Sequence, residues 1–383
     1  MTYKLRSFVE AVSESETSPQ TCPYDRFVGL EHYDPGELEI TRYTDTSLLS
    51  SSVKVFHKND ILIARRNVYL KRAGIVFFDG LTSGDSIILR VLTDCEHLTG
   101  IPFHVALKWL PIVLNSSSFW AYANKHADGM NSKRISKEML LEYEFSKLPL
   151  NEINDISSKV WAAHNLKNSY TKLLEATDEM VKSRFIEELY SRYPKQKLGE
   201  HISVIRGVSY KPSDVRSGNS ETSTAIILRS NNITNGEINF DDLVFVVKER
   251  VQKEQELHKG DIVMCGSNGS ISLVGKAGLL KTNRLNISFG AFCLGIKCKK
   301  TVLPEYLNTY FNTPVYREEI ESMGNGTNII NIRPNNITNI MIPIPPSDKQ
   351  KAFVDFVQQA DKSKFELKQA IEKIDKVMRA LMQ

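Results

Sequence analysis

The chain contains an internal duplication with a period of about 200 residues. The blocks that match are short and keep their order along the sequence. They are Gly36–Leu38 with Gly236–Ile238, His57–Ile61 with His258–Ile262, Ala73–Gly74 with Ala277–Gly278, and Gly129 and Ile135 with Gly326 and Ile332. Because the offset changes from 200 to 201, 204 and 197, insertions and deletions fall between the blocks. A repeat of this length predicts two similar domains, each with its own hydrophobic core.

Each copy ends in a segment whose apolar residues are spaced alternately three and four apart. Such a pattern, kept over about four heptads, is typical of a coiled coil. The two segments align at an offset of 197, and a lysine interrupts the apolar seam at the same position in both. The residues predicted to form the seam are Val160, Lys167, Tyr170, Leu174, Val181, Val357, Lys364, Leu367, Ile371, Ile374 and Met378.

Two arrangements of these helices fit the pattern. Each helix could pack on its own domain alone, as most amphipathic helices do. Alternatively, the two helices could pack against each other in antiparallel orientation and relate the domains by a pseudo-twofold axis. We favour the second arrangement because equivalent helices in one duplicated chain are natural partners. The first helix would be about 45–50 Å long at 1.5 Å per residue, so we expect the helices to act as spacers.

The predicted fold class is therefore α+β, with two similar α/β domains joined and spaced by two long antiparallel coiled-coil helices. The predicted boundaries are 1–150 for the first domain, 151–193 for the first helix, 194–346 for the second domain and 347–383 for the second helix. Short apolar runs bounded by Gly, Pro, Asn and Asp predict strands. These strands are Arg26–Leu30, Asp60–Ile63, Ser86–Val91, Phe145–Leu150, Ala225–Arg229, Asp261–Met264, Ala291–Ile296 and Ile340–Pro346, and Leu303–Phe311 is predicted to be a helix.

The bulk properties are those of a globular cytoplasmic protein. The chain has 383 residues, of which 41% are hydrophobic and 25% charged. The five cysteines lack CxxC spacing, and their odd number argues against a disulfide framework. The first residues lack the apolar core of a signal peptide, so we expect none, and no apolar run approaches the roughly 18 residues that span a membrane. The net charge is only +4, so any nucleic-acid surface must be a local basic patch.

Motifs for catalysis and for cofactors are incomplete in this sequence. Gly269 and Gly275–Lys276 resemble a phosphate-binding loop, but Ala277 stands where Ser or Thr must hold magnesium. Glu366–Lys368 matches the end of a nuclease motif, yet it lies within a heptad segment. The histidines lack metal-binding spacing, and Cys293 and Cys298 are better explained as buried thiols. We therefore expect a binding or assembly protein without catalytic residues, metal or cofactor.

A basic loop follows the predicted strand 60–63 in the first copy. Four cations and one aromatic residue fall within eight residues there. Such a loop can neutralise phosphates, and its Arg and Asn side chains can form bidentate hydrogen bonds with guanine and adenine. An ordinary solvated loop is the alternative. The candidate DNA-binding residues are Arg65, Arg66, Asn67, Tyr69, Lys71 and Arg72, with Lys133 and Arg134 farther along.

The equivalent loop of the second copy, Gly266–Ser270, is small and polar instead. Small residues allow the backbone to approach a ligand closely. Different chemistry at the same position is expected if each loop recognises a different base sequence. The candidate DNA-binding residues of the second copy are Arg229, Asn231, Ser267, Asn268, Ser270, Lys276, Asn328 and Arg333.

Over essentially its whole length the chain resembles the specificity subunit of type I restriction–modification systems. The motifs that carry the resemblance are the repeated Lys-(Asn/Gly)-Asp-Ile block, Ser267–Ser270 followed by Gly275–Gly278, Gly324–Thr327 ahead of Asn331–Ile332, and Ile342–Gln350 leading into a long helix. The family typically has Glu-Gln where this chain has Lys349–Gln350. The first copy keeps the proline and glutamate of Leu148–Glu152 but has Ile153 in place of the glutamine.

The resemblance implies two target-recognition domains, each of which binds one half of a bipartite, asymmetric site on double-stranded DNA. It also implies that the helices bind two methyltransferase subunits, which would hold S-adenosylmethionine, and that a nuclease subunit joins the complete enzyme. The chain itself would be non-catalytic and would serve bacterial defence. Two other functions stay open: a coiled-coil scaffold that binds proteins but no DNA, and a nuclease or methyltransferase that acts alone.

Overall fold

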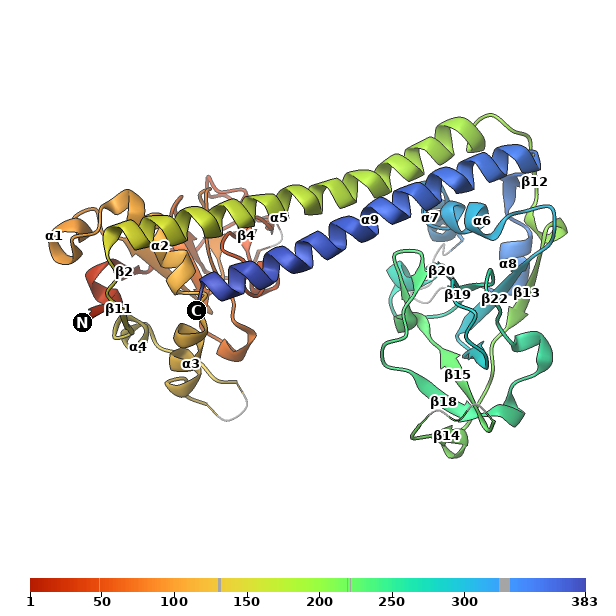
Figure 1. Cartoon of the computed structure of the whole chain (residues 1–383), viewed down its shortest axis with the longest axis horizontal. Coiled ribbons are helices and arrows are strands. Elements are labelled where there is room, and N and C mark those ends of the chain that lie inside the picture. The colour runs from red at the N-terminus through yellow and green to blue at the C-terminus, as the bar shows by residue number, and fades with distance from the viewer. Residues whose placement is uncertain (48, 130–131, 219, 221, 324–330) are drawn as a thin grey trace. The chain divides into compact units, whose positions relative to one another are not determined.

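The computed structural model describes residues 1–47, 49–129, 132–218, 220, 222–323 and 331–383. The chain divides into two compact units: unit 1 is Met1–Lys172 with Leu367–Gln383, and unit 2 is Leu173–Glu366. Each unit contains a β-rich domain and part of each of two long helices, α5 (Leu150–Phe185) and α9 (Ser347–Leu381) (Figure 1). The predicted α+β class, with two domains joined by two long helices, is confirmed.

The described strands of unit 1 form three sheets. Their orders are β1(Thr2–Lys4)-β11(Glu144–Ser146), then β2(Val9–Val12)-β10(Ser86–Val91)-β7(Ile61–Ala64)-β8(Ala73–Ile75), and finally β3(Glu14–Glu16)-β6(Val53–Phe56)-β9(Gly80–Thr82)-β4(Arg26–Val28)-β5(Thr44–Asp45). Helices pack on the second of these sheets. The short helices of this domain are α1 (Cys95–Thr99), α2 (Phe103–Val113), α3 (Ser117–Lys125) and α4 (Lys137–Leu141).

The described strands of unit 2 also form three sheets. Their orders are β12(Lys195–Lys197)-β23(Met341–Pro343), then β13(Ile202–Arg206)-β22(Cys293–Cys298)-β19(Ile262–Cys265)-β20(Ala277–Leu279)-β17(Glu237–Ile238)-β16(Ile233–Thr234), and finally β14(Val215–Arg216)-β18(Val244–Val247)-β15(Thr224–Leu228)-β21(Ile287–Phe289). The short helices are α6 (Pro304–Tyr310), α7 (Pro314–Ser322) and α8 (Pro334–Thr338).

The two domains share a strand framework. The order β2-β10-β7-β8 in unit 1 corresponds to β13-β22-β19-β20 in unit 2, and the parallel pair β4–β9 corresponds to β15–β21. The registers agree as well, because Leu89 pairs with Ile61 in one domain and Ile296 pairs with Ile262 in the other. The central strands of the two domains are therefore equivalent residue by residue, and the domains differ mainly at the sheet edges.

The repeated block that ends in Asp-Ile is a turn that leads into a buried strand. Its third residue has a positive φ, 73° at Asn59 and 97° at Gly260, which few residues other than Asn and Gly adopt readily. The next carboxylate accepts a hydrogen bond of 2.8 Å from the backbone N–H at the start of the turn, at Asp60 and again at Asp261. These two requirements explain why the block is present in both domains.

Both long helices pack on the domain in each unit. In unit 1, Ile153 and Val160 of α5 and Met378 of α9 belong to the same hydrophobic core as the sheet β2-β10-β7-β8. In unit 2, Phe185 of α5 and Phe353 of α9 belong to the core around β19 and β22. Packing of a helix on a domain and packing of the two helices against each other, considered above as alternatives, thus occur together. The beginning of α5 packs with the end of α9 in unit 1, so the helices run antiparallel there.

A lysine of one helix binds an aspartate of the other in each unit. Lys167 Nζ lies 2.7 Å from Asp375 Oδ1 in unit 1, and Lys364 Nζ lies 2.8 Å from Asp178 Oδ1 in unit 2. The two pairs are equivalent at the offset of 197. All predicted seam residues lie in α5 or α9 and are buried or half-buried. Their assignment to a coiled-coil seam stays a prediction.

Several predicted elements have different bounds in the structure. The strand predicted at Phe145–Leu150 is shorter and lies at Glu144–Ser146, because the Pro149 carbonyl already accepts hydrogen bonds from Glu152 and Ile153 at the start of α5. The strand predicted at Ile340–Pro346 shrinks in the same way to Met341–Pro343. The strand Ser86–Val91 has the predicted bounds. Within the described residues, no helix is both long and apolar enough to span a membrane.

Candidate nucleic-acid interface

The loops that diverge between the copies occupy the same place in the two domains. In unit 1, Arg66 follows β7 and pairs with Arg134 in a single antiparallel β-bridge. In unit 2, Ser267 follows β19 and pairs with Asn331 in the same way. The structure therefore brings the basic loop together with Lys133–Arg134, a segment that lies far away in the sequence.

A third segment completes this arrangement in each domain. The backbone N–H of Arg65 donates to the carbonyl of Asp85 over 2.9 Å, and the N–H of Gly266 donates to the carbonyl of Phe292 over 2.8 Å. Three segments from distant parts of the sequence thus meet at equivalent backbone positions. Their side chains are Arg66, Asp85 and Arg134 in one domain and Ser267, Phe292 and Asn331 in the other.

The interface of unit 1 presents two guanidinium groups on either side of one carboxylate. Asp85 lies 3.7 Å from Arg66 Nη1 and 3.6 Å from Arg134 Nη2, while Arg66 Nε donates to Ser132 Oγ over 2.8 Å. Both arginines remain exposed. Exposed ion pairs of this length contribute little stability. A phosphate or a base edge can therefore replace the carboxylate as partner at small cost.

The rest of the basic loop divides into exposed and internal residues. Asn67 and Lys71 have positive φ values of 56° and 54°, and they enclose a short turn that leaves the Tyr69 ring exposed. Arg72 is different, because it donates to the carbonyls of Leu30 (3.0 Å) and Arg66 (3.2 Å). Arg72 therefore holds the loop in place.

The interface of unit 2 lines a hollow of about 880 Å³. Four predicted residues from two loops meet there: Arg229, Asn231, Ser267 and Asn268. The carboxylate of Asp242 accepts hydrogen bonds from Arg229 Nη2 (2.8 Å) and Asn231 Nδ2 (3.0 Å). Asp242 therefore holds these two donors in position in the lining of the hollow.

The other predicted residues of unit 2 lie elsewhere or are internal. Arg333 lines a second hollow of about 370 Å³, together with Ser267 and Phe292. Ser270 forms a hydrogen bond of 2.9 Å with Ser272, and Lys276 is half-buried just before β20; neither lines the hollows described above. Asn328 lies outside the described residues.

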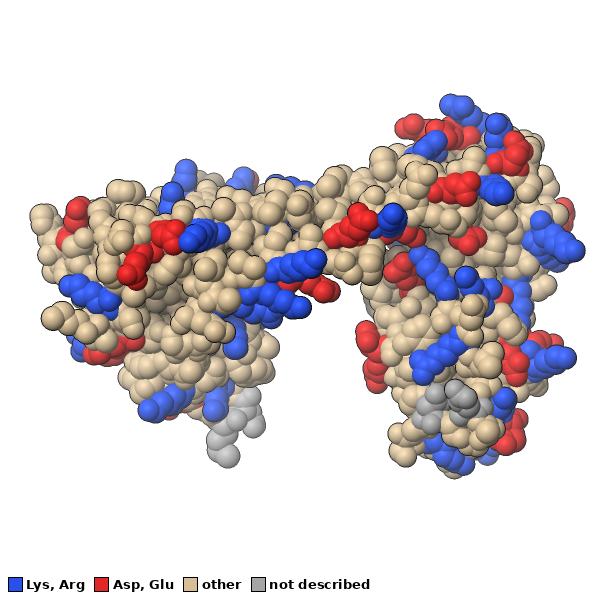
Figure 2. All heavy atoms as spheres, viewed as in Figure 1, with Lys and Arg blue, Asp and Glu red and all other residues tan. Residues whose placement is uncertain are grey.

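Sequence patterns did not point to Asp85, to Phe292 or to Tyr210, which lines the larger hollow of unit 2. Phe292 lay within a predicted strand, so nothing marked it as a surface residue. An alignment at an offset of 207, which matches β10 with β22, would have placed Phe292 opposite Asp85. Figure 2 shows basic and acidic side chains interspersed over the visible face of each unit, as the small net charge suggests. The face of each unit that is visible in this view is therefore not uniformly basic.

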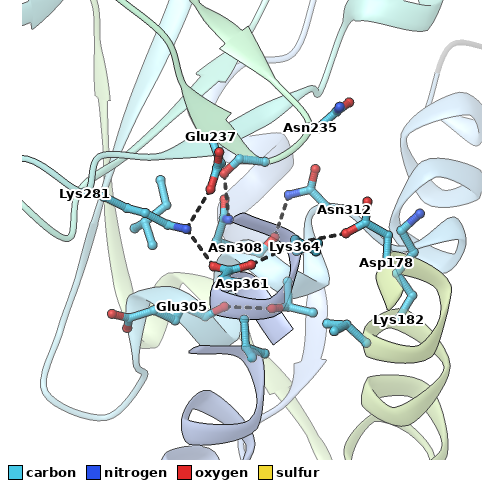
Figure 3. Close-up of a pocket in the computed structure, with 15 residues that line it drawn as sticks. Asp178, Lys182, Asn235, Glu237, Lys281, Glu305, Asn308, Asn312, Asp361 and Lys364 are labelled. Atoms are coloured by element: carbon cyan, nitrogen blue, oxygen red, sulfur yellow. Dashed lines mark hydrogen bonds and ion pairs between the residues drawn. The ribbon is translucent and has the colours of Figure 1, made fainter. Parts of the chain in front are cut away.

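A network of ion pairs connects the domain of unit 2 with both long helices, beside a cavity of about 210 Å³ (Figure 3). Lys281 Nζ lies 2.8 Å from Glu237 of the domain and 2.7 Å from Asp361 of α9. Lys364 joins Asp361 (2.9 Å) to Asp178 of α5. Burial alone would raise the pKa of Asp361, but the two ammonium groups lower it overall.

The network of unit 1 has the same place but a different composition. Glu37, the counterpart of Glu237, binds Lys167 directly. His164 occupies the position of Asp361, and its ring lies 3.5 Å from Glu37 and 3.6 Å from Glu39. Burial lowers the pKa of His164, but the two carboxylates outweigh it and raise the pKa overall. We call these two networks the joints of unit 1 and unit 2.

Known proteins match this chain in sequence. Residues 208–376 match the family model of the type I restriction modification DNA specificity domain. The specificity subunit of the type I restriction enzyme StySPI from Salmonella potsdam is 35% identical over 184 residues, which are 47% of this chain and 39% of that protein. The EcoKI specificity subunit from Escherichia coli (strain K12) is 33% identical over 184 residues, with the same shares. The chain thus spans about two fifths of the length of these curated relatives.

Solved structures share the fold over the whole chain. The S subunit of a type I restriction–modification system from M. genitalium has a TM-score of 0.53 at 14% identity and covers 100% of this chain and 95% of its own. A chain from a study of complex assembly and conformational transition in the type I R-M system has a TM-score of 0.56 at 13% identity, covering 100% and 96%. At such identities the likeness shows the fold alone.

Proposed function

Because the chain belongs to the family of type I restriction–modification specificity subunits, we propose that it selects the DNA sequence on which such a complex acts. Residues 1–150 and 194–346 serve as two target-recognition domains, and 151–193 and 347–383 serve as spacer helices. The chain contributes no catalytic residue of its own. Its place is the cytoplasm, where the DNA is.

One observation carries this proposal: the interface has equivalent backbone positions in both domains but different side chains. Arg66, Asp85 and Arg134 form a charged cluster in one domain, and Ser267, Phe292 and Asn331 stand at the same positions in the other. Base edges are distinguished by the pattern of donors, acceptors and methyl groups that they present. Two such different surfaces suit two different half-sites, so the target is bipartite and asymmetric.

The remaining cations hold the DNA backbone. Phosphate contacts fix the position of a protein on a duplex, while base contacts provide the sequence information. Arg72 supports this surface from behind through its carbonyl contacts. The residues that we assign to DNA contact are Arg65, Arg66, Asn67, Tyr69, Lys71, Lys133, Arg134, Arg229, Asn231, Ser267, Asn268, Ser270, Lys276 and Arg333, with Asn328 retained from the sequence.

Partner subunits supply the chemistry. Two methyltransferase subunits bind the long helices and hold S-adenosylmethionine, and a nuclease subunit joins the complete enzyme. Support comes from Leu166, Leu173 and Met180 of α5, three exposed apolar residues spaced seven apart. Phe365 and Val377 are similarly exposed on α9. Apolar side chains that repeat along an exposed helix favour a protein partner.

Sequence-specific DNA binding tests the proposal. The target follows from mapping the methylated positions in the genome of the host. The full chain, purified with its methyltransferase subunits, should bind a duplex with this target much more tightly than a scrambled duplex. Arg66→Ala should weaken specific binding about tenfold, because a base or phosphate contact is lost. Lys58→Ala removes the same charge at the opposite end of β7 and should leave binding unchanged.

The contrary results are equally definite. A chain that assembles with partners but binds every duplex equally weakly is a protein scaffold. Methylation or cleavage by the chain alone, with S-adenosylmethionine or magnesium, would establish an enzyme. Loss of assembly in Arg66→Ala would make the basic loop structural.

A further inference from the structure

Phe292 is a large apolar side chain at the position where the other domain has a carboxylate. Its side chain is 73% exposed. The carbonyl of Phe292 accepts hydrogen bonds from Gly266 (2.8 Å) and Ser267 (3.1 Å), so its backbone is fixed to the polar loop after β19. An exposed aromatic ring tied to a polar candidate DNA-binding loop needs an explanation that a scattered surface residue would not need.

The surroundings of this ring are concave and apolar. Phe292 lines both hollows of unit 2. Val208, Tyr210 and Ala291 line the larger hollow with it, while Arg229 and Asn268 supply polar groups there. Apolar wedges that unstack bases must project from a protein surface. Phe292 lines a hollow instead, which favours a site that receives an apolar group protruding from the DNA.

The major groove of DNA offers one such group. Adenine, guanine and cytosine present only donors and acceptors there, whereas thymine also presents its C5-methyl group, which Phe and other apolar side chains contact. Resting on the function proposed above, we infer that the hollow at Phe292 accepts the methyl group of a thymine in the half-site of the second domain. Arg229 and Asn268 then bind neighbouring polar edges.

The corresponding position of the first domain has a different lining among the residues that the structure describes. Asp85 stands in place of Phe292, with Arg66 and Arg134 within 3.7 Å and 3.6 Å of its carboxylate. A carboxylate between two guanidinium groups disfavours a methyl group, because the charged groups would lose solvent without gaining a partner. The subsite therefore gives the second half-site a requirement that the first half-site does not share at this position.

Replacement of thymine by deoxyuridine tests the inference, because it removes only the methyl group. The probes are duplexes with the mapped target in which each thymine is replaced singly, bound by the full chain assembled with its methyltransferase subunits. One replacement in the half-site of the second domain should weaken binding about fourfold, which corresponds to one buried methyl group. Phe292→Ser should bind the unmodified target about fourfold more weakly and should lose the preference for thymine at that position. Phe292→Leu keeps an apolar side chain and should retain most of the affinity and most of the preference for thymine.

Deoxyuridine in the half-site of the first domain is the internal control, and its effect should be the same in all three proteins. Equal binding of thymine and deoxyuridine throughout the second half-site, or a preference that survives Phe292→Ser, would overturn the subsite while target-specific binding stands. A second half-site without thymine on either strand would overturn it too. Absence of target-specific binding would instead refute the proposed function.

Discussion

The joints of the two units lie at equivalent positions but place opposite charges on the long helix. Each connects its domain to both long helices at equivalent positions, yet α5 contributes His164 where α9 contributes Asp361. In unit 1 the domain offers Glu37 and Glu39, so the helix must present a cation. In unit 2 the domain also offers Lys281, which lets the helix present an anion. Both joints thus pair positive with negative groups, although the residues at equivalent positions differ in charge.

Replacement of His164 by the aspartate found at the equivalent position of α9 should have the largest effect on stability. His164→Asp places a third carboxylate beside Glu37 and Glu39 at a position where the native side chain is 2% exposed. We expect a loss of about 3 kcal/mol or more in the stability of unit 1, because a buried charge without a partner is costly. Hydrogen–deuterium exchange should show faster exchange in β7 and β10 and little change in β19 and β22. Equal exchange in both pairs of strands would contradict the local nature of the joint.

The residues at the beginnings of the long helices make a second contrast. Gln350, only 2% exposed, donates to the carbonyls of Thr301 (3.0 Å) and Pro345 (2.8 Å) and accepts from the N–H of Leu303 (2.8 Å). Its counterpart Ile153 is buried without polar groups. Gln350→Leu should cost about 2 kcal/mol in urea denaturation, because buried backbone groups lose their partners. Ile153→Leu should cost less than about 1.5 kcal/mol, and a reversed order would show that the hydrogen bonds are dispensable.

The two lysines of the helix pairs should behave alike. Lys167→Met removes the contacts with Glu37 and Asp375, and Lys364→Met removes those with Asp178 and Asp361. Each variant leaves its carboxylates with fewer partners, and we expect a loss of about 1 kcal/mol confined to its own unit. Hydrogen–deuterium exchange of the two halves of α5 separates the effects. A variant that increases hydrogen exchange equally in both halves of α5 would show that the loss of stability is not confined to one unit.

A change of pH should have the smallest effect on stability, and this effect should be confined to the joint of unit 1. The raised pKa of His164 means that its stabilisation is complete below the unfolded value of about 6.5 and is lost as pH rises through the folded value. The polar groups in contact with its ring include Glu37, Glu39 and Asn168, and Lys167 shares the carboxylate of Glu37. In the joint of unit 2 the pKa values of Lys281 and Lys364 are raised and that of Asp361 is lowered, so these three groups keep their charges near neutral pH.

Thermal unfolding of the native chain and of His164→Gln measures this effect. The difference between the two proteins should be largest near pH 6 and should shrink toward pH 9. The corresponding difference for Lys364→Met should stay constant over this range. A difference for His164→Gln that grows with pH would mean that the neutral imidazole is the stabilising form.

Sequence patterns predicted the framework well, for reasons that can be stated. The heptad spacing of α5 and α9 and the turn at Asn59 and Gly260 depend on neighbours within a few residues, so local rules suffice. The shared lysine was recognised as an interruption of the seam. Its partners were not recognised, because Asp375 and Asp178 come from the other helix and their approach depends on how the helices pack.

The candidate interface was predicted only in part. The loops Arg65–Arg72 and Gly266–Ser270 stood out by composition. Phe292 and Asp85 did not, because their positions beside those loops depend on the register of β22 with β19 and of β10 with β7. Composition marked Arg72 only by its charge, and its hydrogen bonds to the carbonyls of Leu30 and Arg66 could be recognised only in the folded chain. A contact between Arg72 and DNA stays a prediction.

The division of the chain into units has a consequence for its synthesis. Unit 2 is one continuous stretch, Leu173–Glu366, whereas unit 1 needs Leu367–Gln383 in addition to Met1–Lys172. The ribosome therefore completes all residues of unit 2 before it makes the last part of unit 1, in which Met378 enters the core. The domain that is made first therefore cannot complete its core until the end of translation, when the last turns of α9 become available to cover it.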